Sequence, residues 1–288
     1  MSLVLNMIGG GGSFTATDAI LRVQAPLNSI VTITKGSVTK TDLGHENADR
    51  PAIYDYYFII HQSQFDSVNA WTITATKGTD TNSTQIIVNA SDEYDVLISY
   101  NVPLDVYQSV EYLQSSGSQR IVTGLTNVDG AEFEFQYLSV GTYNSVFGAR
   151  DTSSSANRFG FQASTNELFA VVAPNNVTCG SFDLLKHKVT QGVKFSNNVT
   201  FDGVEKGTGS GSKSSKETAI FCERYSSNWD TYSSIKLFYI KLYKGQTLER
   251  EMYPCYRLSD SVAGLYDKAN NTFYTNSGTG TFTVGPDV

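Results

Sequence analysis

Residues 131–137 read AEFEFQY and alternate between apolar and polar side chains. Successive side chains of an extended strand point to opposite faces of a sheet, so the two kinds separate onto two faces. The two sets are Phe133, Phe135 and Tyr137 on one face, and Glu132, Glu134 and Gln136 on the other. One apolar face beside one polar face is typical of an antiparallel strand that covers a core on one side. We therefore predict a half-buried strand here.

The same period of two recurs along the chain. Three further stretches show it, at residues 29–35, 71–76 and 94–100. Clusters of Gly, Asn, Asp and Lys separate such stretches, as expected for tight turns between strands. We find no stretch of about twelve residues with the 3.6-residue period of an amphipathic helix. The sequence therefore predicts an all-β protein, with helix limited to short turns such as one near residues 63–68.

Length and one proline divide the chain. At 288 residues it is long enough for two domains. Pro103 restricts the residue before it and cannot join a central strand, which places a boundary near residues 101–103. Residues 14–101 suit an immunoglobulin-like β-sandwich, and residues 102–288 suit a larger jelly-roll sandwich. Residues 1–13 are predicted to form a flexible tail.

Charge and composition exclude several classes of function. Lys and Arg number 21 and Asp and Glu number 28, which gives a net charge of −7. An acidic chain is poorly suited to neutralise the phosphates of a nucleic acid or of anionic lipids. The apolar run at residues 3–8 is too short to span a membrane and lacks the features of a secretory signal. We expect no nucleic-acid partner, no membrane insertion and no signal peptide.

The cysteines and histidines show no metal-binding spacing. Cys179, Cys222 and Cys255 are isolated, and the three histidines lie far apart. Zinc sites need close pairs of these residues. We predict three reduced, buried thiols, no metal and no cofactor. A single disulfide, and a calcium ion bound by loop oxygens, are the alternatives.

One loop is the best candidate for binding a ligand. Residues 222–232 read CERYSSNWDTY and combine aromatic rings with polar groups. A sugar presents a C–H face that stacks on aromatic rings and hydroxyls that need polar partners, and antibody paratopes use a similar mixture. The candidate binding residues are Arg224, Tyr225, Asn228, Trp229, Asp230 and Tyr232. The alternatives for Trp229 are packing in a small core and contact in an oligomer or between domains.

A second polar loop adds two candidate binding residues, Arg150 and Asp151, with Asn157 and Arg158 close behind them in sequence. Arginine and aspartate provide the donors and acceptors that sugar hydroxyls need. We therefore predict that this loop also contacts the ligand.

Two acids raise a catalytic alternative. Glu132 and Glu134 share one strand face, and glycoside hydrolases use paired carboxylates. Some jelly-roll glucanases carry a third acid further along the same strand, and Tyr137 stands in its place. A solvated outer sheet face is the favoured interpretation, so we predict no catalytic residue.

A longer segment points to a fold family. Residues 186–208 read KHKVTQGVKFSNNVTFDGVEKGT. This pattern resembles the strand–turn–strand signature of laminin G-like, concanavalin A-like jelly rolls, although the tryptophan usual before the histidine is absent. The matching positions are His187, Val189, Phe201, Asp202, Gly203 and Glu205. The Asp-Gly pair suits a tight turn with positive φ, while Val199 and Phe201 would pack inward. The resemblance implies a two-layer sandwich over most of residues 106–288.

A second resemblance concerns biological setting. Residues 111–119 and 236–280 resemble the opening and closing segments of jelly rolls in prophage and phage tail proteins of gut Firmicutes. In those proteins an immunoglobulin-like module often precedes the jelly roll. The resemblance implies a virion-tail or cell-surface adhesin. Assembly in the cytosol and release by lysis would place such a protein outside the cell without a signal peptide or disulfides.

Together these features predict a noncatalytic binding protein. Its expected partners are a cell-surface polysaccharide or glycan and other tail or surface proteins. Repetition of the site across a homo-oligomer would add avidity. Two alternatives stay open, a structural spacer whose partners are only proteins and a polysaccharide hydrolase.

Overall fold

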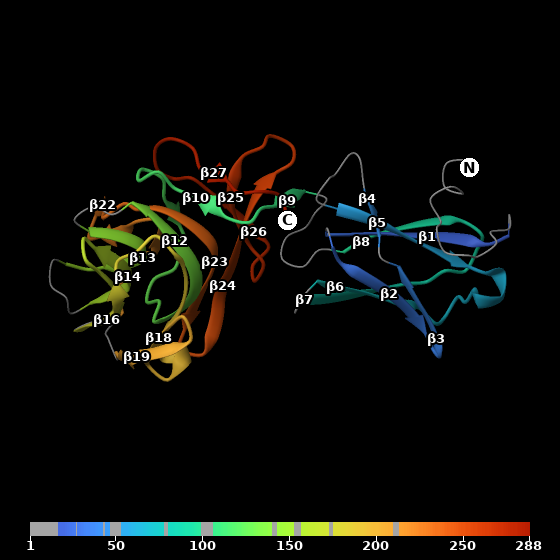
Figure 1. Cartoon of the computed structure of the whole chain (residues 1–288), viewed down its shortest axis with the longest axis horizontal. Helices are drawn as coiled ribbons and strands as arrows, with labels where there is room; N and C mark the ends of the chain where they lie inside the picture. The colour runs from blue at the N-terminus through green and yellow to red at the C-terminus, as the bar shows by residue number, and fades with distance from the viewer. Residues whose placement is uncertain are drawn as a thin grey trace. The chain divides into compact units, whose positions relative to one another are not determined.

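The computed structural model describes most of the chain. The described residues are 17–26, 28–42, 44–46, 53–77, 80–98, 106–139, 143–152, 157–172, 175–209 and 213–288. Among them every regular element is a β-strand, except for two 3-10 turns, η2 (Gln62–Gln64) and η3 (Val193–Phe195). The protein is therefore all-β, as its alternating pattern predicted (Figure 1). The expected tail at residues 1–13 and the boundary at residues 101–103 lie outside the described residues.

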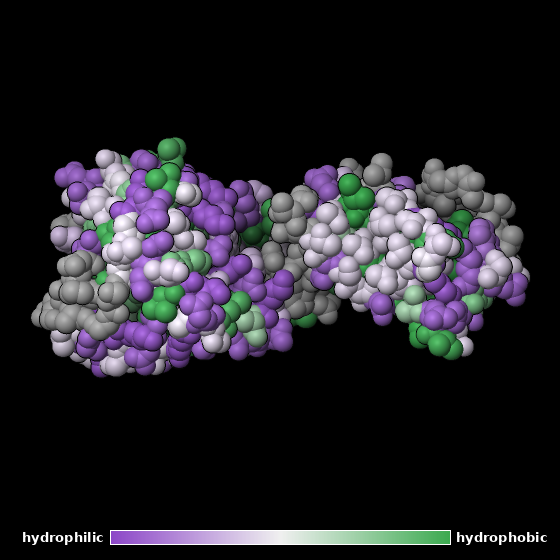
Figure 2. All heavy atoms as spheres, turned by 90° about the horizontal axis from the view of Figure 1, so that it is seen from below, coloured by the Kyte–Doolittle hydropathy of each residue, from purple (hydrophilic) through white to green (hydrophobic). Residues whose placement is uncertain are grey.

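The described residues form no helix that is both long and apolar enough to cross a membrane. Contacts divide the chain into one unit up to residue 105 and a second unit of residues 106–287. On the face drawn in Figure 2, hydrophobic residues form small separate groups among hydrophilic ones. Scattered apolar residues of this kind are normal for a protein surface.

Two four-stranded sheets make up the first unit. The strands of one sheet, in spatial order, are β4 (His45–Glu46), β5 (Ile53–Ile60), β1 (Ala19–Pro26) and β8 (Glu93–Leu97). The strands of the other are β3 (Val38–Asp42), β2 (Ile30–Lys35), β6 (Trp71–Lys77) and β7 (Asp80–Ile86). All pairs are antiparallel except β1 with β8, which is parallel.

The two sheets of the first unit share one core. Leu21, Ile33, Tyr56 and Trp71, from four strands of both sheets, belong to a single buried cluster. The strands predicted at residues 29–35 and 71–76 are confirmed as β2 and β6, with small differences at their ends. The strand predicted at residues 94–100 is confirmed as β8 as far as residue 97, and residues 99 and 100 lie outside the described residues. Alternation found them because one face of each strand is removed from water.

The larger sheet of the second unit has eleven strands. Its main path is β19 (Val204–Thr208), β18 (Asn198–Phe201), β17 (Lys186–Gly192), β12 (Gly130–Ser139), β23 (Ser234–Lys244), β24 (Thr247–Arg257), β25 (Ala263–Asp267) and β26 (Thr272–Thr275). Three short strands join it, β9 (Tyr107–Ser109) on β24, and β10 (Leu113–Gln114) between β23 and β27 (Thr283–Val284).

The second sheet of this unit has eight strands. Its main path is β11 (Ile121–Val122), β20 (Ala219–Ile220), β13 (Tyr143–Arg150), β14 (Arg158–Ser164), β15 (Glu167–Val172) and β16 (Asn175–Ser181). A hairpin of β21 (Glu223–Tyr225) and β22 (Asn228–Asp230) joins it, because β21 pairs in parallel with β13. This hairpin contains most of the candidate binding residues.

Aromatic rings from both sheets form the core of the second unit. Phe133 of β12 lies 5.2 Å from Phe147 of β13 and 5.3 Å from Phe161 of β14, measured between ring centroids. All three side chains are fully buried, and each contributes roughly 1.5–3 kcal/mol by leaving water. The strand predicted from AEFEFQY is therefore confirmed, with its aromatic face inward.

The predicted Asp-Gly turn is also confirmed. Asp202 and Gly203 have φ values of 51° and 79° and connect β18 to β19. Val199 and Phe201 are buried, as the alternation of this segment predicted.

Candidate ligand-binding site

The β21–β22 hairpin places the predicted binding residues beside strand β13. Within the hairpin Arg224 pairs with Trp229 and Tyr225 pairs with Asn228. Ser226, in the two-residue turn, has φ 50°, in the left-handed region that a tight hairpin turn uses. The parallel pairing of β21 with β13 sets Arg150 next to Tyr225. Two loops that are separate in sequence thus meet at one edge of the sheet.

A buried carboxylate lies beneath the hairpin. Glu223 is 1% exposed and forms ion pairs with two arginines. Its Oε1 lies 2.7 Å from Nε of Arg158, and its Oε2 lies 3.0 Å from Nε of Arg150. Gln162 contacts Arg158 and donates to Oγ of Ser145 at 2.7 Å. A buried charge must be paired, so this network fixes the hairpin to β13 and β14.

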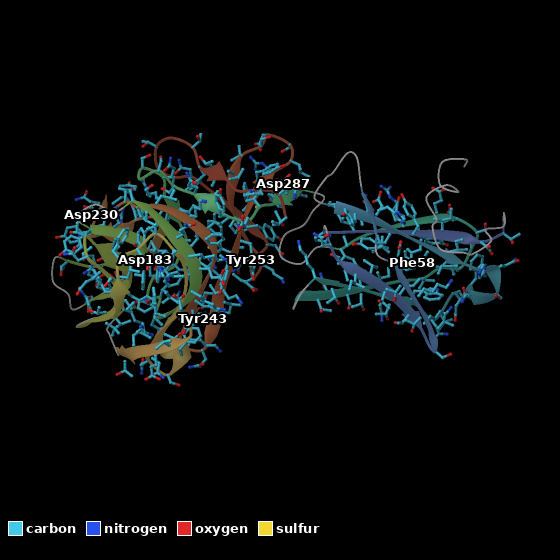
Figure 3. The ribbon with its side chains drawn as sticks, in the orientation of Figure 1. Phe58, Asp183, Asp230, Tyr243, Tyr253 and Asp287 are labelled. Atoms are coloured by element: carbon cyan, nitrogen blue, oxygen red, sulfur yellow. The ribbon has the colours of Figure 1, made fainter. Side chains whose placement is uncertain are left out.

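Arg150 connects this buried network to the surface. One of its terminal nitrogens, Nη2, lies 2.9 Å from Oδ2 of Asp230, which is exposed at the end of the hairpin (Figure 3). Its guanidinium carbon lies 4.2 Å from the centre of the Tyr225 ring. Arg150 therefore holds two of the candidate residues in place at once.

Two arginine side chains lie over the ring of Trp229. The guanidinium carbon of Arg224 lies 4.2 Å from the ring centre of Trp229, and that of Arg120 lies 4.6 Å from it. Nη1 of Arg120 also donates to the hydroxyl of Tyr232 at 2.6 Å. We call Arg120, Arg150, Arg224, Tyr225, Trp229, Asp230 and Tyr232 the arginine–aromatic cluster.

The structure brings together seven of the eight residues predicted from sequence. Six belong to the arginine–aromatic cluster, and Asn228 is exposed in the same hairpin, opposite Tyr225. Asp151 has other partners. Its Oδ1 accepts hydrogen bonds from Oγ of Ser214 and from the backbone N–H and Oγ of Ser215.

The contacts of Asp151 affect its titration. Burial alone would raise the pKa of its carboxyl, but hydrogen bonds from Ser214 and Ser215 to the ionised form bring the pKa below its usual value. Asn157 also donates to its Oδ2 at 3.1 Å. Asp151 thus fastens residues 214–215 to the end of β13.

Sequence reasoning missed two members of the site. Arg120 lies a hundred residues before the hairpin and shows no pattern of its own. Glu223 has no charged partner close in sequence except Arg224, yet its partners are Arg150 and Arg158. Both arginines belong to the second polar loop that the sequence predicted. An expectation that the two candidate loops lie side by side would have suggested arginine partners for Glu223.

The two acids considered for catalysis lie elsewhere, on the outer face of β12. Nζ of Lys188 lies 3.2 Å from Oε1 of Glu132, and Nζ of Lys186 lies 2.8 Å from Oε2 of Glu134. The Tyr239 hydroxyl donates to Glu132 at 2.9 Å, and burial together with this carboxylate raises the pKa of Tyr239 well above its usual value. Each acid is therefore held in an ion pair.

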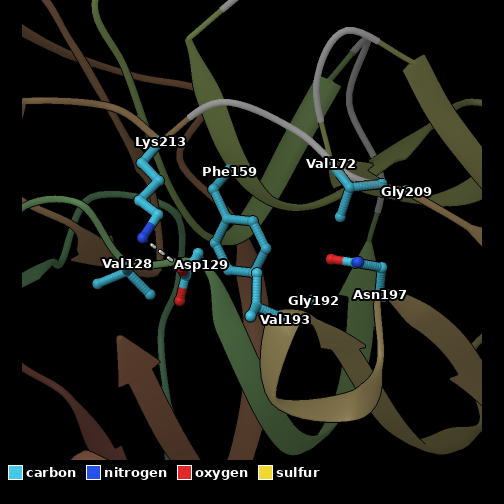
Figure 4. A pocket seen from close by; sticks show the side chains of 9 residues that line it. All are labelled: Val128, Asp129, Phe159, Val172, Gly192, Val193, Asn197, Gly209 and Lys213. Carbon is cyan, nitrogen blue, oxygen red and sulfur yellow. Dashed lines mark ion pairs between the residues drawn. The ribbon is translucent and has the colours of Figure 1, made fainter. Parts of the chain in front are cut away.

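A small cavity lies at another place in the second unit (Figure 4). Its volume is about 10 Å³, room for about one water molecule. The lining residues are Val128, Asp129, Phe159, Val172, Gly192, Val193, Asn197, Gly209 and Lys213. Nζ of Lys213 lies 2.5 Å from Oδ2 of Asp129. The cavity is too small for a sugar.

Within the described part of the chain, no group of three or more His, Cys, Asp or Glu side chains is arranged to hold a metal ion. All three cysteines are buried and unpaired, as predicted.

No protein-family model and no curated protein matches the chain. One solved structure that it resembles is a protein from Bacteroides ovatus described as "a putative carbohydrate binding protein". The alignment covers 93% of each chain, with 9% sequence identity and a TM-score of 0.40.

Proposed function

We propose that this chain is a noncatalytic carbohydrate-binding protein and that the arginine–aromatic cluster is its binding site. The observation that carries the proposal is the combination of three half-buried aromatic side chains with arginine, asparagine and aspartate side chains on one hairpin and directly after it. Tyr225, Trp229 and Tyr232 are all partly accessible. Such a mixture offers both surfaces that a sugar needs, apolar area and directed hydrogen bonds.

The arginines on the rings add to this chemistry. A guanidinium that stacks on an aromatic face keeps its N–H groups in its own plane, so they stay able to donate to a ligand. Arg120 and Arg224 are held in this way by Trp229. Because Glu223 and Arg150 fix the hairpin beneath them, little ordering is needed on binding, which favours affinity.

The setting that we propose follows the sequence resemblances. The first unit would be an immunoglobulin-like module and the second a laminin G-like jelly roll, in a phage or prophage tail or a bacterial surface structure. Its partners would be a cell-surface glycan and neighbouring tail or surface proteins. Several copies in a homo-oligomer would raise the effective affinity of a single site.

A glycan array probed with a multimerised sample tests the proposal. We expect retention on a subset of bacterial or host polysaccharides, and loss of that retention in Trp229→Ala. Leu185→Ala is the matched control, because it removes a large side chain that is 65% exposed at another place in the same unit. Binding to no glycan in any format would overturn the proposal.

The alternative that the cluster is a contact between proteins predicts a different result for Trp229→Ala. If Trp229→Ala changes the oligomeric state in light scattering while glycan retention is unchanged, the cluster is a protein contact. A hydrolase would release reducing sugar, and that release would disappear in Glu132→Gln or Glu134→Gln.

A further inference from the structure

Two arginines of the second unit lack a carboxylate partner among the residues that the structure describes. The structure describes seven of the eight arginines, and five of those seven lie within 4 Å of a carboxylate oxygen. These five are Arg22, Arg150, Arg158, Arg250 and Arg257. The two others, Arg120 and Arg224, have no carboxylate so close among the described residues, and both lie over the ring of Trp229.

The acids near these two arginines already have partners. Glu223 pairs with Arg150 and Arg158, and Asp230 pairs with Arg150. Four arginines therefore lie at this edge of the sheet, and its two carboxylates pair with only two of them, in a chain whose net charge is −7. Positive charge that an acidic protein leaves unneutralised at one place is suited to an anionic partner.

The surrounding contacts also hold the side chains of Arg120 and Arg224 in one orientation. Each is only partly accessible, so its position is fixed by packing. Nη1 of Arg120 is oriented by the Tyr232 hydroxyl, while its Nε is buried without a hydrogen-bond partner. Arginine offers its remaining N–H groups in a planar fork that matches carboxylate and phosphate oxygens.

We infer that the ligand of this site is an acidic saccharide, whose carboxylate or phosphate oxygens are bound by Arg120 and Arg224. This inference rests on the proposed function. A neutral glycan would cover two cations without pairing them, which is unfavourable, whereas an acidic group would neutralise them. The site would thus select by charge first and by sugar identity second.

The test compares polymers that differ in charge. The probes are polygalacturonate, which carries carboxylates, its fully methyl-esterified form, which has the same backbone without charge, and phosphorylated dextran, which carries phosphates on a sugar backbone. We expect binding to at least one anionic polymer, about tenfold or more tighter than to the methyl ester. Binding should weaken as salt rises, since the attraction is electrostatic. The two anionic arms separate a carboxylate ligand from a phosphate ligand.

Variants assign the effect to the two arginines. Arg120→Gln and Arg224→Gln should each weaken anionic binding by about tenfold or more, and Arg224→Lys should retain part of it. Arg257→Gln is the control, because Arg257 is a partly exposed arginine paired with Asp260 in another part of the unit. Circular dichroism establishes that each variant is folded. Binding that Arg257→Gln weakens as much as the cluster variants do would overturn the inference.

The outcomes separate the inference from the proposed function. Retention of neutral glycans on the array, without salt dependence and without preference for the anionic polymers, overturns the acidic ligand and leaves carbohydrate binding standing. Retention of acidic glycans that Arg224→Gln abolishes supports both. The absence of any glycan binding overturns both. Anionic binding that Arg120→Gln and Arg224→Gln both leave unchanged overturns the assignment of the acidic group to these two arginines.

Discussion

The guanidinium carbon of Arg224 lies 4.2 Å from the ring centre of Trp229, and the two residues face each other across one hairpin. Cross-strand neighbours on the same face of a hairpin are held in contact by the backbone pairing itself. The stack is therefore a fixed part of the hairpin. The Trp229 ring therefore positions the charged guanidinium of Arg224, in addition to offering apolar surface.

The two tryptophans provide one fluorescent reporter in each unit. Trp71 is 0% exposed in the first unit, and Trp229 is partly exposed in the second. Trp229→Phe should leave emission that is blue-shifted and resistant to acrylamide, because Trp71 is covered by the core. Trp71→Phe should leave red-shifted emission that acrylamide quenches. Equal quenching of the two variants would contradict the burial that the structure assigns to them.

Glu223 should be important for the stability of the second unit. Glu223→Gln removes the negative charge between Arg150 and Arg158, which leaves Arg158 without a carboxylate and Arg150 with only the exposed Asp230. Breaking a buried pair of this kind costs about 3–5 kcal/mol of unfolding free energy. Urea denaturation would measure the loss. The control Glu217→Gln changes an exposed acid and should shift stability by less than about 0.5 kcal/mol. A loss below about 1 kcal/mol for Glu223→Gln would contradict this prediction.

Alternation was sufficient to predict the strands because burial on one face selects apolar residues at every second position. The stretch AEFEFQY shows this most clearly, since Phe133, Phe135 and Tyr137 all enter the core. The sequence pattern does not show which strands pair with each other. The parallel pairing of β1 with β8 and of β21 with β13 joins residues that are distant in sequence. No local pattern encodes such pairs.

The candidate site was predictable only where its residues are neighbours in sequence. Residues 223–230 form one hairpin and Tyr232 follows two residues later, so the composition of this stretch showed them together. Arg120 joins the site through the tertiary fold alone. Arg150 and Asp151 are consecutive, and consecutive side chains at a strand end point to different sides. Arg150 therefore reaches the cluster, while Asp151 bonds to residues 214–215.

The three thiols should be unreactive in the folded protein. Burial raises the pKa of Cys222 and Cys255 to about 12 and that of Cys179 to about 11. The thiolate is the reactive form, so little of it exists at pH 8. We expect no reaction with Ellman's reagent in buffer and reaction of three thiols in denaturant. Rapid reaction of even one thiol in the native protein would contradict the buried positions.

Asp183 should make stability depend on pH in the acid range. Burial alone would raise its pKa, but hydrogen bonds from the Leu185 backbone and from His187, together with the charge of that ring, lower it below the usual value. Its contribution is therefore fully present above the unfolded-state pKa, near 4, and is lost as pH falls through the lower folded-state pKa.

Asp183→Asn tests this dependence. The Asp183 side chain is 41% exposed, so solvent screening limits its contribution to about 1 kcal/mol or less. The variant should be less stable than the parent at pH 6, and the difference should shrink below pH 4. The control Glu217→Gln should show no such convergence, because its parent side chain is exposed. A difference that stays constant from pH 6 to pH 3 would contradict the assignment.

Substitution of Gly192 and Gly245 by alanine separates two effects on stability, the positive φ of the residue and the room for a methyl group beside it. Both have positive φ, 96° and 57°. A methyl group at Gly245 would meet open space, so Gly245→Ala should cost only the left-handed strain, about 1–2 kcal/mol. A methyl group at Gly192 would lie 2.0 Å from the carbonyl oxygen of Asp129. That oxygen accepts a hydrogen bond from the Val193 N–H at 2.8 Å, so it cannot move away without breaking the bond.

Gly192→Ala should therefore destabilise the second unit by more than Gly245→Ala, by about 2 kcal/mol or more, since strain, overlap and a broken buried hydrogen bond add together. Urea denaturation followed by the reaction of the three thiols measures this unit alone, because all the cysteines lie in it. Equal midpoints for the two variants would show that the β12–β17 junction adapts to a side chain. The close approach of Gly192 to Asp129 would then have no role in fixing the sheet beside the Asp129–Lys213 ion pair.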